Sequence, residues 1–251
     1  MRQRNLLIAV GVAGFFVFAL ALVPARMMSA VLPEESISIS ATSGTLWSGT
    51  AQSVVIAGFQ LRDVSWELHA LSLLIGRLSL SVDAKWETGF VRGDIAAGIT
   101  GALRVRDLRV AGPLAPVVRQ LNMRGSGGEL SVDIAELEVE DRWPTRFIGT
   151  VGVGRLPFSM LGIPGGSTGS YGLEFDIAEV AEDGVIPGML TDSGGPLEVV
   201  GELRLTPPQD YAIQARLKAR PDAPPELTQG LMLAGPKLPD GSHEFEMTGS
   251  L

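Results

Sequence analysis

The sequence predicts a mainly β protein, in which an N-terminal transmembrane helix precedes a twisted, curved antiparallel sheet domain with one to three short helices. Three features of the 251 residues lead to this prediction. Residues 6–23 form a stretch of 18 residues without a charge. Much of the remaining chain alternates apolar and polar residues, the pattern of a strand with one buried face. Glycine contributes 31 residues, roughly 12% against a usual share of about 7%, and glycine is typical of bends and bulges in sheets.

The N-terminal stretch has the length and the flanking charges of a membrane span. As a helix rising about 1.5 Å per residue it measures roughly 27 Å, close to the thickness of the hydrocarbon core. Arg2 and Arg4 precede it and the first acidic residue is Glu34, which places residues 1–5 in the cytoplasm. The alternative is a cleaved signal peptide, but its apolar region is usually shorter, and the candidate cleavage site Met28–Ala30 lacks a small first residue. We therefore predict a retained single-pass anchor over residues 6–23.

After the anchor we expect a linker over residues 24–35 and one β-rich, exported domain over residues 36–251. Arg2, Arg4 and Arg26 account for three of the 20 basic residues, so residues 27–251 carry 17 basic and 28 acidic side chains, a net charge of −11. This acidic balance argues against a nucleic-acid-binding surface. It also disfavours a domain that lies flat on anionic lipid headgroups.

Several segments have a period of two, so their side chains alternate between a buried and a wet face. Clean alternation of this kind favours antiparallel strands. The alternating segments are residues 78–87, 171–177, 197–205, 211–217 and 245–251.

Interruptions of this period predict bulges, a hairpin and the helices. The alternation slips by one residue near 106–107 and near 135–136, and a bulge in each strand would absorb the slip. The residues Pro207–Asp210 separate two alternating runs, which predicts a hairpin over 197–217. Short helices are expected over 113–122 and 226–234, with Pro225 in the first turn, and 67–75 is ambiguous between helix and strand.

The residue inventory excludes most enzymatic chemistry. With no cysteine and only two histidines, His69 and His243, the chain lacks the usual ligands of a metal centre and a thiol nucleophile. The string Asp192–Pro196 (D-S-G-G-P) resembles the sequence around a serine-protease nucleophile. However, Thr191 replaces the expected glycine, and His69 lies in an unrelated context. We interpret the string as a turn before a strand, and predict no enzyme, cofactor or metal site.

Three motifs resemble the type II secretion system protein N family (general secretion pathway protein N). The first is the S-G-T-L-W-S-G segment within Thr42–Ala51, and the second is V-S-W-E-L at Val64–Leu68, followed by a G-R-L at Gly76. The third is Asp192–Leu197, continuing through Gly201–Pro207 to Arg220–Leu227. The motif residues, with a structural or interaction role, are Ser43, Gly44, Thr45, Leu46, Trp47, Gly49, Trp66, Gly76, Asp192, Gly194, Gly195, Pro196, Pro221, Pro224 and Pro225.

The resemblance implies an accessory, non-enzymatic component of the type II secretion system in the inner membrane of a Gram-negative bacterium. The domain would then be periplasmic, contact other secretion components and support export of folded proteins across the outer membrane. An alternative is an AsmA-like envelope protein that binds or transfers lipid in an apolar β-groove. The alternative requires that the apolar positions 78, 80, 82, 173, 175, 203 and 205 form an open channel.

Overall fold

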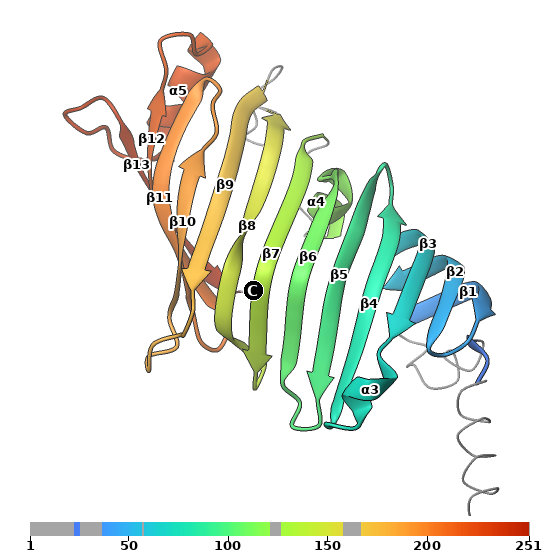
Figure 1. Ribbon diagram of the computed structural model, residues 1–251. Coiled ribbons are helices and arrows are strands. Elements are labelled where there is room, and N and C mark those ends of the chain that lie inside the picture. Colours follow the sequence, from blue (N-terminus) through green and yellow to red (C-terminus); the bar gives the residue numbers. More distant parts are fainter. Residues whose placement is uncertain (1–22, 26–36, 57, 121–126, 158–166, 251) are drawn as a thin grey trace, which may run out of the picture.

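The computed structural model describes residues 23–25, 37–56, 58–120, 127–157 and 167–250 (Figure 1). Almost all of the predicted anchor and linker therefore lies outside the described residues, and the proposed domain boundaries stay predictions. Among the residues that are described, no helix has the length and apolar character needed to cross a membrane.

The described chain forms one antiparallel sheet of thirteen strands, and each strand pairs with the strand that follows it in the sequence. The sheet is not closed, so β1 and β13 are its edge strands. Figure 1 shows a twisted sheet whose two end regions turn away from the plane of the central strands. The strands are β1 (Ile37–Gly44), β2 (Ser48–Ile56), β3 (Phe59–Leu68), β4 (Arg77–Trp86), β5 (Gly89–Gly98), β6 (Leu103–Pro113), β7 (Glu129–Glu140), β8 (Trp143–Pro157), β9 (Ser167–Ile177), β10 (Ile186–Asp192), β11 (Leu197–Thr206), β12 (Asp210–Ala219) and β13 (His243–Ser250).

Because every connection joins adjacent antiparallel strands, the turns lie alternately at two ends of the sheet. One end carries α3 (Ala70–Leu73) between β3 and β4, and we call it the α3 end. The opposite end carries α4 (Ala115–Gln120) after β6 and α5 (Pro225–Ala234) after β12, and we call it the α5 end. Figure 1 shows α3 at the lower end and both longer helices at the upper end.

The alternating pattern places the apolar side chains on one face of the sheet, the apolar face. A row of them crosses the strands: Trp66 pairs with Val82, Leu108 with Ile134, and Gly188 with Leu203. The row continues between these pairs through glycines, because Gly93 lies against Leu108, Gly149 pairs with both Ile134 and Phe175, and Gly188 lies against Phe175. Two clusters of buried side chains lie at opposite ends of this row. The first contains Ala25, Ala51, Val54, Val64, Trp66 and Ala84, and the second contains Leu197, Val199, Ala215, Leu227 and Leu231.

The structure confirms the predicted bulges. Asp107 is skipped in the pairing of β5 with β6 and has a φ of 49°, and Ala135 is skipped in the pairing of β7 with β8. The predicted slips therefore lie where each strand accommodates one extra residue. An extra residue bends its strand and increases the local twist, which contributes to the twist of the long sheet.

The predicted hairpin and helices are also confirmed, with refined bounds. Strands β11 and β12 pair from Leu197 to Ala219 around the turn at 207–209. Pro225 occupies the first turn of α5, as its fixed φ favours. The ambiguous stretch 67–75 contains both structures, since β3 ends at Leu68 and α3 begins at Ala70.

Candidate functional site

The first motif forms the turn of the β1–β2 hairpin. Gly44 has a φ of 90°, a conformation that L side chains rarely adopt. Thr45 closes the turn, because its backbone N–H donates to the Ser48 carbonyl (2.9 Å) and its hydroxyl accepts from the Ser48 N–H (3.2 Å). A β-carbon on Gly49 would lie 2.5 Å from the Trp66 ring, so only glycine lets the indole lie against β2.

This turn also connects three segments of the chain. The Trp66 indole N–H donates to the Leu46 carbonyl (3.1 Å), and the Leu46 N–H donates to the Val23 carbonyl (2.8 Å). The Leu68 N–H donates to the Trp47 carbonyl (2.6 Å). Ala25 is buried in the core cluster of β2–β4. The first motif therefore fixes the end of the N-terminal segment to the first three strands.

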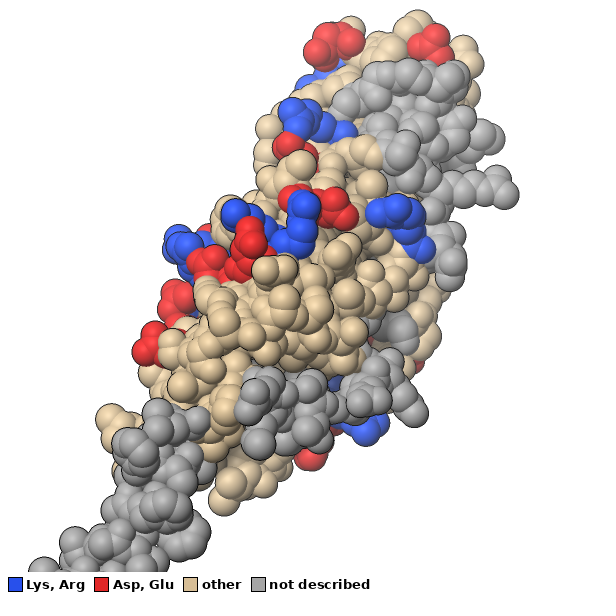
Figure 2. All heavy atoms as spheres, turned by 90° about the vertical axis from the view of Figure 1, so that its right-hand side faces the viewer, with Lys and Arg blue, Asp and Glu red and all other residues tan. Residues whose placement is uncertain are grey.

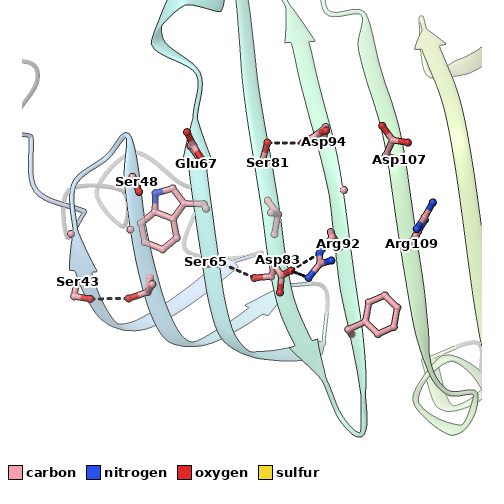
Figure 3. A pocket seen from close by; sticks show the side chains of 17 residues that line it. Ser43, Ser48, Ser65, Glu67, Ser81, Asp83, Arg92, Asp94, Asp107 and Arg109 are labelled. Carbon is pink, nitrogen blue, oxygen red and sulfur yellow. Dashed lines mark hydrogen bonds and ion pairs between the residues drawn. The ribbon is translucent and has the colours of Figure 1, made fainter.

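A pocket of about 930 Å³ lies beside this turn, lined mostly by polar side chains of β1–β6 (Figure 3). Its hydroxyl and carboxylate groups already contact one another. Ser43 and Thr50 share a hydrogen bond of 2.8 Å, the Ser81 hydroxyl donates to Asp94, and Arg92 pairs with Asp83. The pocket thus offers hydrogen-bonding groups for a polar partner. Among the described residues that line it there is no histidine.

The face opposite the apolar face carries a ladder of cross-strand ion pairs from β3 to β8. Lys85 contacts Asp63 at 2.9 Å and Arg104 contacts Glu138 at 2.6 Å. Glu136 is shared by two guanidinium groups, those of Arg106 and Arg146. Figure 2 shows acidic and basic side chains gathered along one side of the molecule, next to a broad area of the described residues without charge. Opposite charges on facing strands favour this register.

The third motif builds a turn at the α5 end, between β10 and β11. The Asp192 carboxylate accepts the backbone N–H groups of Gly194 (3.0 Å) and Val199 (3.2 Å), and it pairs with the Arg220 guanidinium at 2.6 Å. Arg220 also donates to the Gly195 carbonyl. Burial on its own would raise the pKa of Asp192, but the hydrogen bonds from Arg220 and the two N–H groups lower it below its ordinary value. We call this set the Asp192–Arg220 lock.

The prolines of the third motif lead into α5. Pro221 follows the lock in a turn, and Pro224 precedes the helix as its N-cap residue in an extended conformation. Leu227 and Leu231, one turn apart on α5, are 1% and 5% exposed in the core cluster of β11 and β12. This segment therefore closes the C-terminal end of the apolar face.

The structure brings the predicted motif residues together in two places, not in one site. Residues 43–49 and Trp66 meet at the β1–β2 turn, and Gly76 follows α3 nearby at the same end. Residues 192–196 and the prolines of 221–225 meet at the opposite ends of the strands, and six or more strands away across the sheet. His69 follows β3 and Ser193 follows β10, at opposite ends of strands that lie seven places apart in the sheet, so they form no catalytic pair. Residues 193–196 form the turn before β11, as predicted.

The second histidine and the remaining acidic groups form no metal site either. The His243 ring contacts the Gly235 carbonyl through Nδ1 at 3.0 Å. Within the described ranges, no group of three or more histidine or acidic side chains could hold a metal ion.

Sequence reasoning missed two features of these sites. Arg220 was noticed only as part of a motif, and nothing in the sequence indicated that it pairs with Asp192, 28 residues earlier. Glu136 and Glu138 alternate with the apolar residues Leu137 and Val139 on β7, a pattern that is usually a solvated strand face. The matching alternation of Arg104 and Arg106 on β6 was the available indication that they belong to a cross-strand ladder.

Comparisons with known proteins agree with the motif resemblance. Residues 35–246, which include twelve whole strands and part of β13, match the family model of the type II secretion system (T2SS), protein N. The type II secretion system protein N of Aeromonas hydrophila is 26% identical over 264 aligned positions, covering 98% of each chain. The protein of the same name from Vibrio cholerae serotype O1 is 37% identical over 60 residues, 24% of each chain. No solved structure matches significantly. The chain belongs to the type II secretion system protein N family.

Proposed function

We propose that this chain is a non-enzymatic accessory component of the type II secretion system, anchored in the inner membrane, that supports export of folded proteins across the outer membrane. The observation that carries the proposal is the family match over residues 35–246, which spans nearly the whole sheet. Family membership implies interaction with other components of the secretion system. The two places where the motif residues meet are structural junctions in this proposal, and neither acts as a catalytic site.

The proposed topology has a cytoplasmic N-terminus at residues 1–5, a span at 6–23 and a periplasmic domain at 36–251. It rests on the 18 uncharged residues and on the arginines before them. The hydrogen bond from Leu46 to Val23 supports it, because it fixes the end of that stretch directly to the first hairpin of the sheet.

We propose that the contact with a secretion component uses the edge of β1. An edge strand offers unpaired backbone groups, and charged side chains normally protect it against pairing with another chain. Strand β13 carries Glu244 and Glu246, whereas β1 (I-S-I-S-A-T-S-G) carries no charge. Of the two edges, β1 therefore fits an extended segment of a partner better.

Deletion of the gene in its host bacterium tests the role in secretion. We expect a folded substrate of the type II system to accumulate in the periplasm, and a plasmid copy to restore its export. A protein that leaves the cell by another route serves as the control, because its export should not change. Unaltered export of the type II substrate by the deletion strain would contradict the proposal.

A second candidate function, lipid binding, is favoured by the apolar face. The seven positions that the alternative requires lie on this one face. Leu78 is 47% exposed, and most of the others are half-buried, although Phe175 is 3% exposed. In the described ranges the sheet is a single layer, so no second sheet covers these side chains. Native mass spectrometry of the purified chain would detect bound lipid, and protein without lipid would exclude this function.

A further inference from the structure

A group of large apolar side chains is exposed at the α3 end of the sheet. Leu71, Leu74 and Ile75 on α3 and the turn after it are 80%, 82% and 70% exposed, and Ile99 in the β5–β6 turn is 89% exposed. The two turns are adjacent, because the Ile99 N–H donates to the Gly76 carbonyl at 3.2 Å. We call these four residues the apolar tip. Exposing so much apolar surface in one place is unfavourable in water and typical of an interaction site.

The tip lies next to the point where the predicted membrane span joins the sheet. The β1–β2 turn, which holds the Val23 carbonyl, lies at the same α3 end, and Leu68 connects that turn to the beginning of α3. Between one and four strand spacings separate the turn from the tip, about 5–20 Å. Trp47 lies in the same turn, and tryptophan favours the interface between membrane and water. A span that ends at Val23 therefore brings the tip to the bilayer surface.

The charges near the tip fit this position. Residues 68–78 contain Arg77 but no acidic residue, and residues 95–103 contain no charge, although the exported domain is strongly acidic. The loop before β10 lies at the same end of the sheet but farther along it, and carries Glu179, Glu182 and Asp183. Anionic headgroups would repel that loop and tolerate the tip. At the α3 end, therefore, the apolar tip has a composition suited to a membrane surface and the loop before β10 does not.

We propose that the apolar tip inserts into the headgroup and acyl boundary of the inner membrane, so that the domain stands on the periplasmic surface with its α3 end down. Shallow insertion of leucine and isoleucine is how interfacial segments bind lipid, typically to a depth of about 5–10 Å. This inference rests on the proposed anchoring, since residues 6–23 bring the tip to the membrane. The insertion fixes the orientation of the sheet and leaves the α5 end far from the bilayer.

Fluorescence quenching in vesicles tests the insertion. The natural chain has no cysteine, so a single introduced cysteine can be labelled specifically. The full chain carrying Leu74→Cys, with an environment-sensitive dye, is reconstituted in vesicles of phosphatidylethanolamine and phosphatidylglycerol that contain lipid spin-labelled near the headgroup. The matched control is Thr88→Cys, an exposed position at the opposite end of the same β4–β5 hairpin. We expect the dye at 74 to lose most of its fluorescence and the dye at 88 to keep it.

A second set of variants keeps the test independent of one label position. Ile75→Cys is compared with and without Leu71→Ser, Leu74→Ser and Ile99→Ser, substitutions at exposed positions that leave the core intact. We expect the substitutions to abolish the quenching at 75. Equal fluorescence at 74 and 88 overturns the insertion, and so does a dye at 74 that is shielded from water but not quenched by lipid, since a second copy of the chain would then cover the tip.

Extraction of the same vesicles with alkaline carbonate separates this inference from the proposed anchor. Protein that resists extraction but shows no quenching at 74 retains its anchor and contradicts the insertion. Protein that is quenched before extraction and released by it supports the insertion and contradicts the anchor. Protein that is released and never quenched contradicts both.

Discussion

The first strands of this single sheet (β1–β4, the N-terminal end) and its last strands (β10–β13, the C-terminal end) have the same architecture but different surfaces. Each end has its own buried cluster, one around Trp66 on β2–β4 and one around Leu227 beneath α5. The C-terminal end is closed by a helix and by the Asp192–Arg220 lock. The N-terminal end carries an uncharged edge strand and exposed apolar residues. We infer that the C-terminal end provides stability and that the N-terminal end makes the contacts.

The strand order explains how two ends of one sheet can differ in this way. Every strand pairs only with its neighbours in sequence, so the contacts are local, as in a repeat protein. In such a sheet a substitution mainly affects the strands next to it. The following predictions use this property to test the difference between the ends, beginning with the largest effect.

Removing the side chain of Leu227 should loosen the C-terminal end most. Leu227→Ala leaves a cavity beneath α5, and we expect a loss of about 3 kcal/mol in the local free energy of unfolding. Hydrogen exchange should accelerate in β11 and β12 and remain slow in β2–β4. Met232→Ala is the control on the same helix, because Met232 is 66% exposed. Equal acceleration across all strands would show that the sheet unfolds as one unit.

Adding a methyl group at Gly49 should destabilise the N-terminal strands and leave the C-terminal strands unaffected. The new β-carbon would lie 2.5 Å from the Trp66 ring and 2.7 Å from the Ser43 carbonyl oxygen. We expect Gly49→Ala to destabilise β1–β3 by about 2 kcal/mol, a typical cost of overpacking. Gly98→Ala is the control, since its nearest neighbours lie at 3.6 Å or more. Measured by hydrogen exchange, similar stability of both variants would refute the close packing of the first motif.

Replacing Asp192 by asparagine should have a smaller, pH-dependent effect. Loss of the charged hydrogen bonds to Arg220 is expected to cost about 1.5 kcal/mol. Because folding lowers the pKa of Asp192, the stabilisation is complete above its unfolded pKa of about 3.9 and disappears as the pH falls through the folded value. Urea unfolding of wild type and Asp192→Asn should therefore differ at pH 7 and converge in acid. A difference that is independent of pH would contradict the lock.

The fold was largely predictable, because period and phase are local properties of the sequence. The bulges at Asp107 and Ala135 follow from single slips of the alternation, and Pro225 indicates the start of α5. The single open layer could not be predicted, because apolar and polar residues alternate in the same way along the strands of a sandwich and of a single sheet. The motif residues were recognised by resemblance, but their separation into two places, six or more strands apart, follows only from the strand order. Likewise the pairing of Asp192 with Arg220 could not be predicted, because only the fold brings the β10–β11 connection and the β12–β13 connection together.

The edge of β1 makes the functional contact in the role that we propose for this chain. The direct test introduces two lysines at exposed positions of each edge, Ser38→Lys with Ser40→Lys on β1, and Thr248→Lys with Ser250→Lys on β13 as the matched control. Export of a type II substrate is measured in the deletion strain, relative to the amount of each variant in the membrane fraction. We expect the β1 variant to lose most export at normal abundance and the β13 variant to retain it. Normal export by the β1 variant, or loss by the β13 variant alone, would contradict the claim.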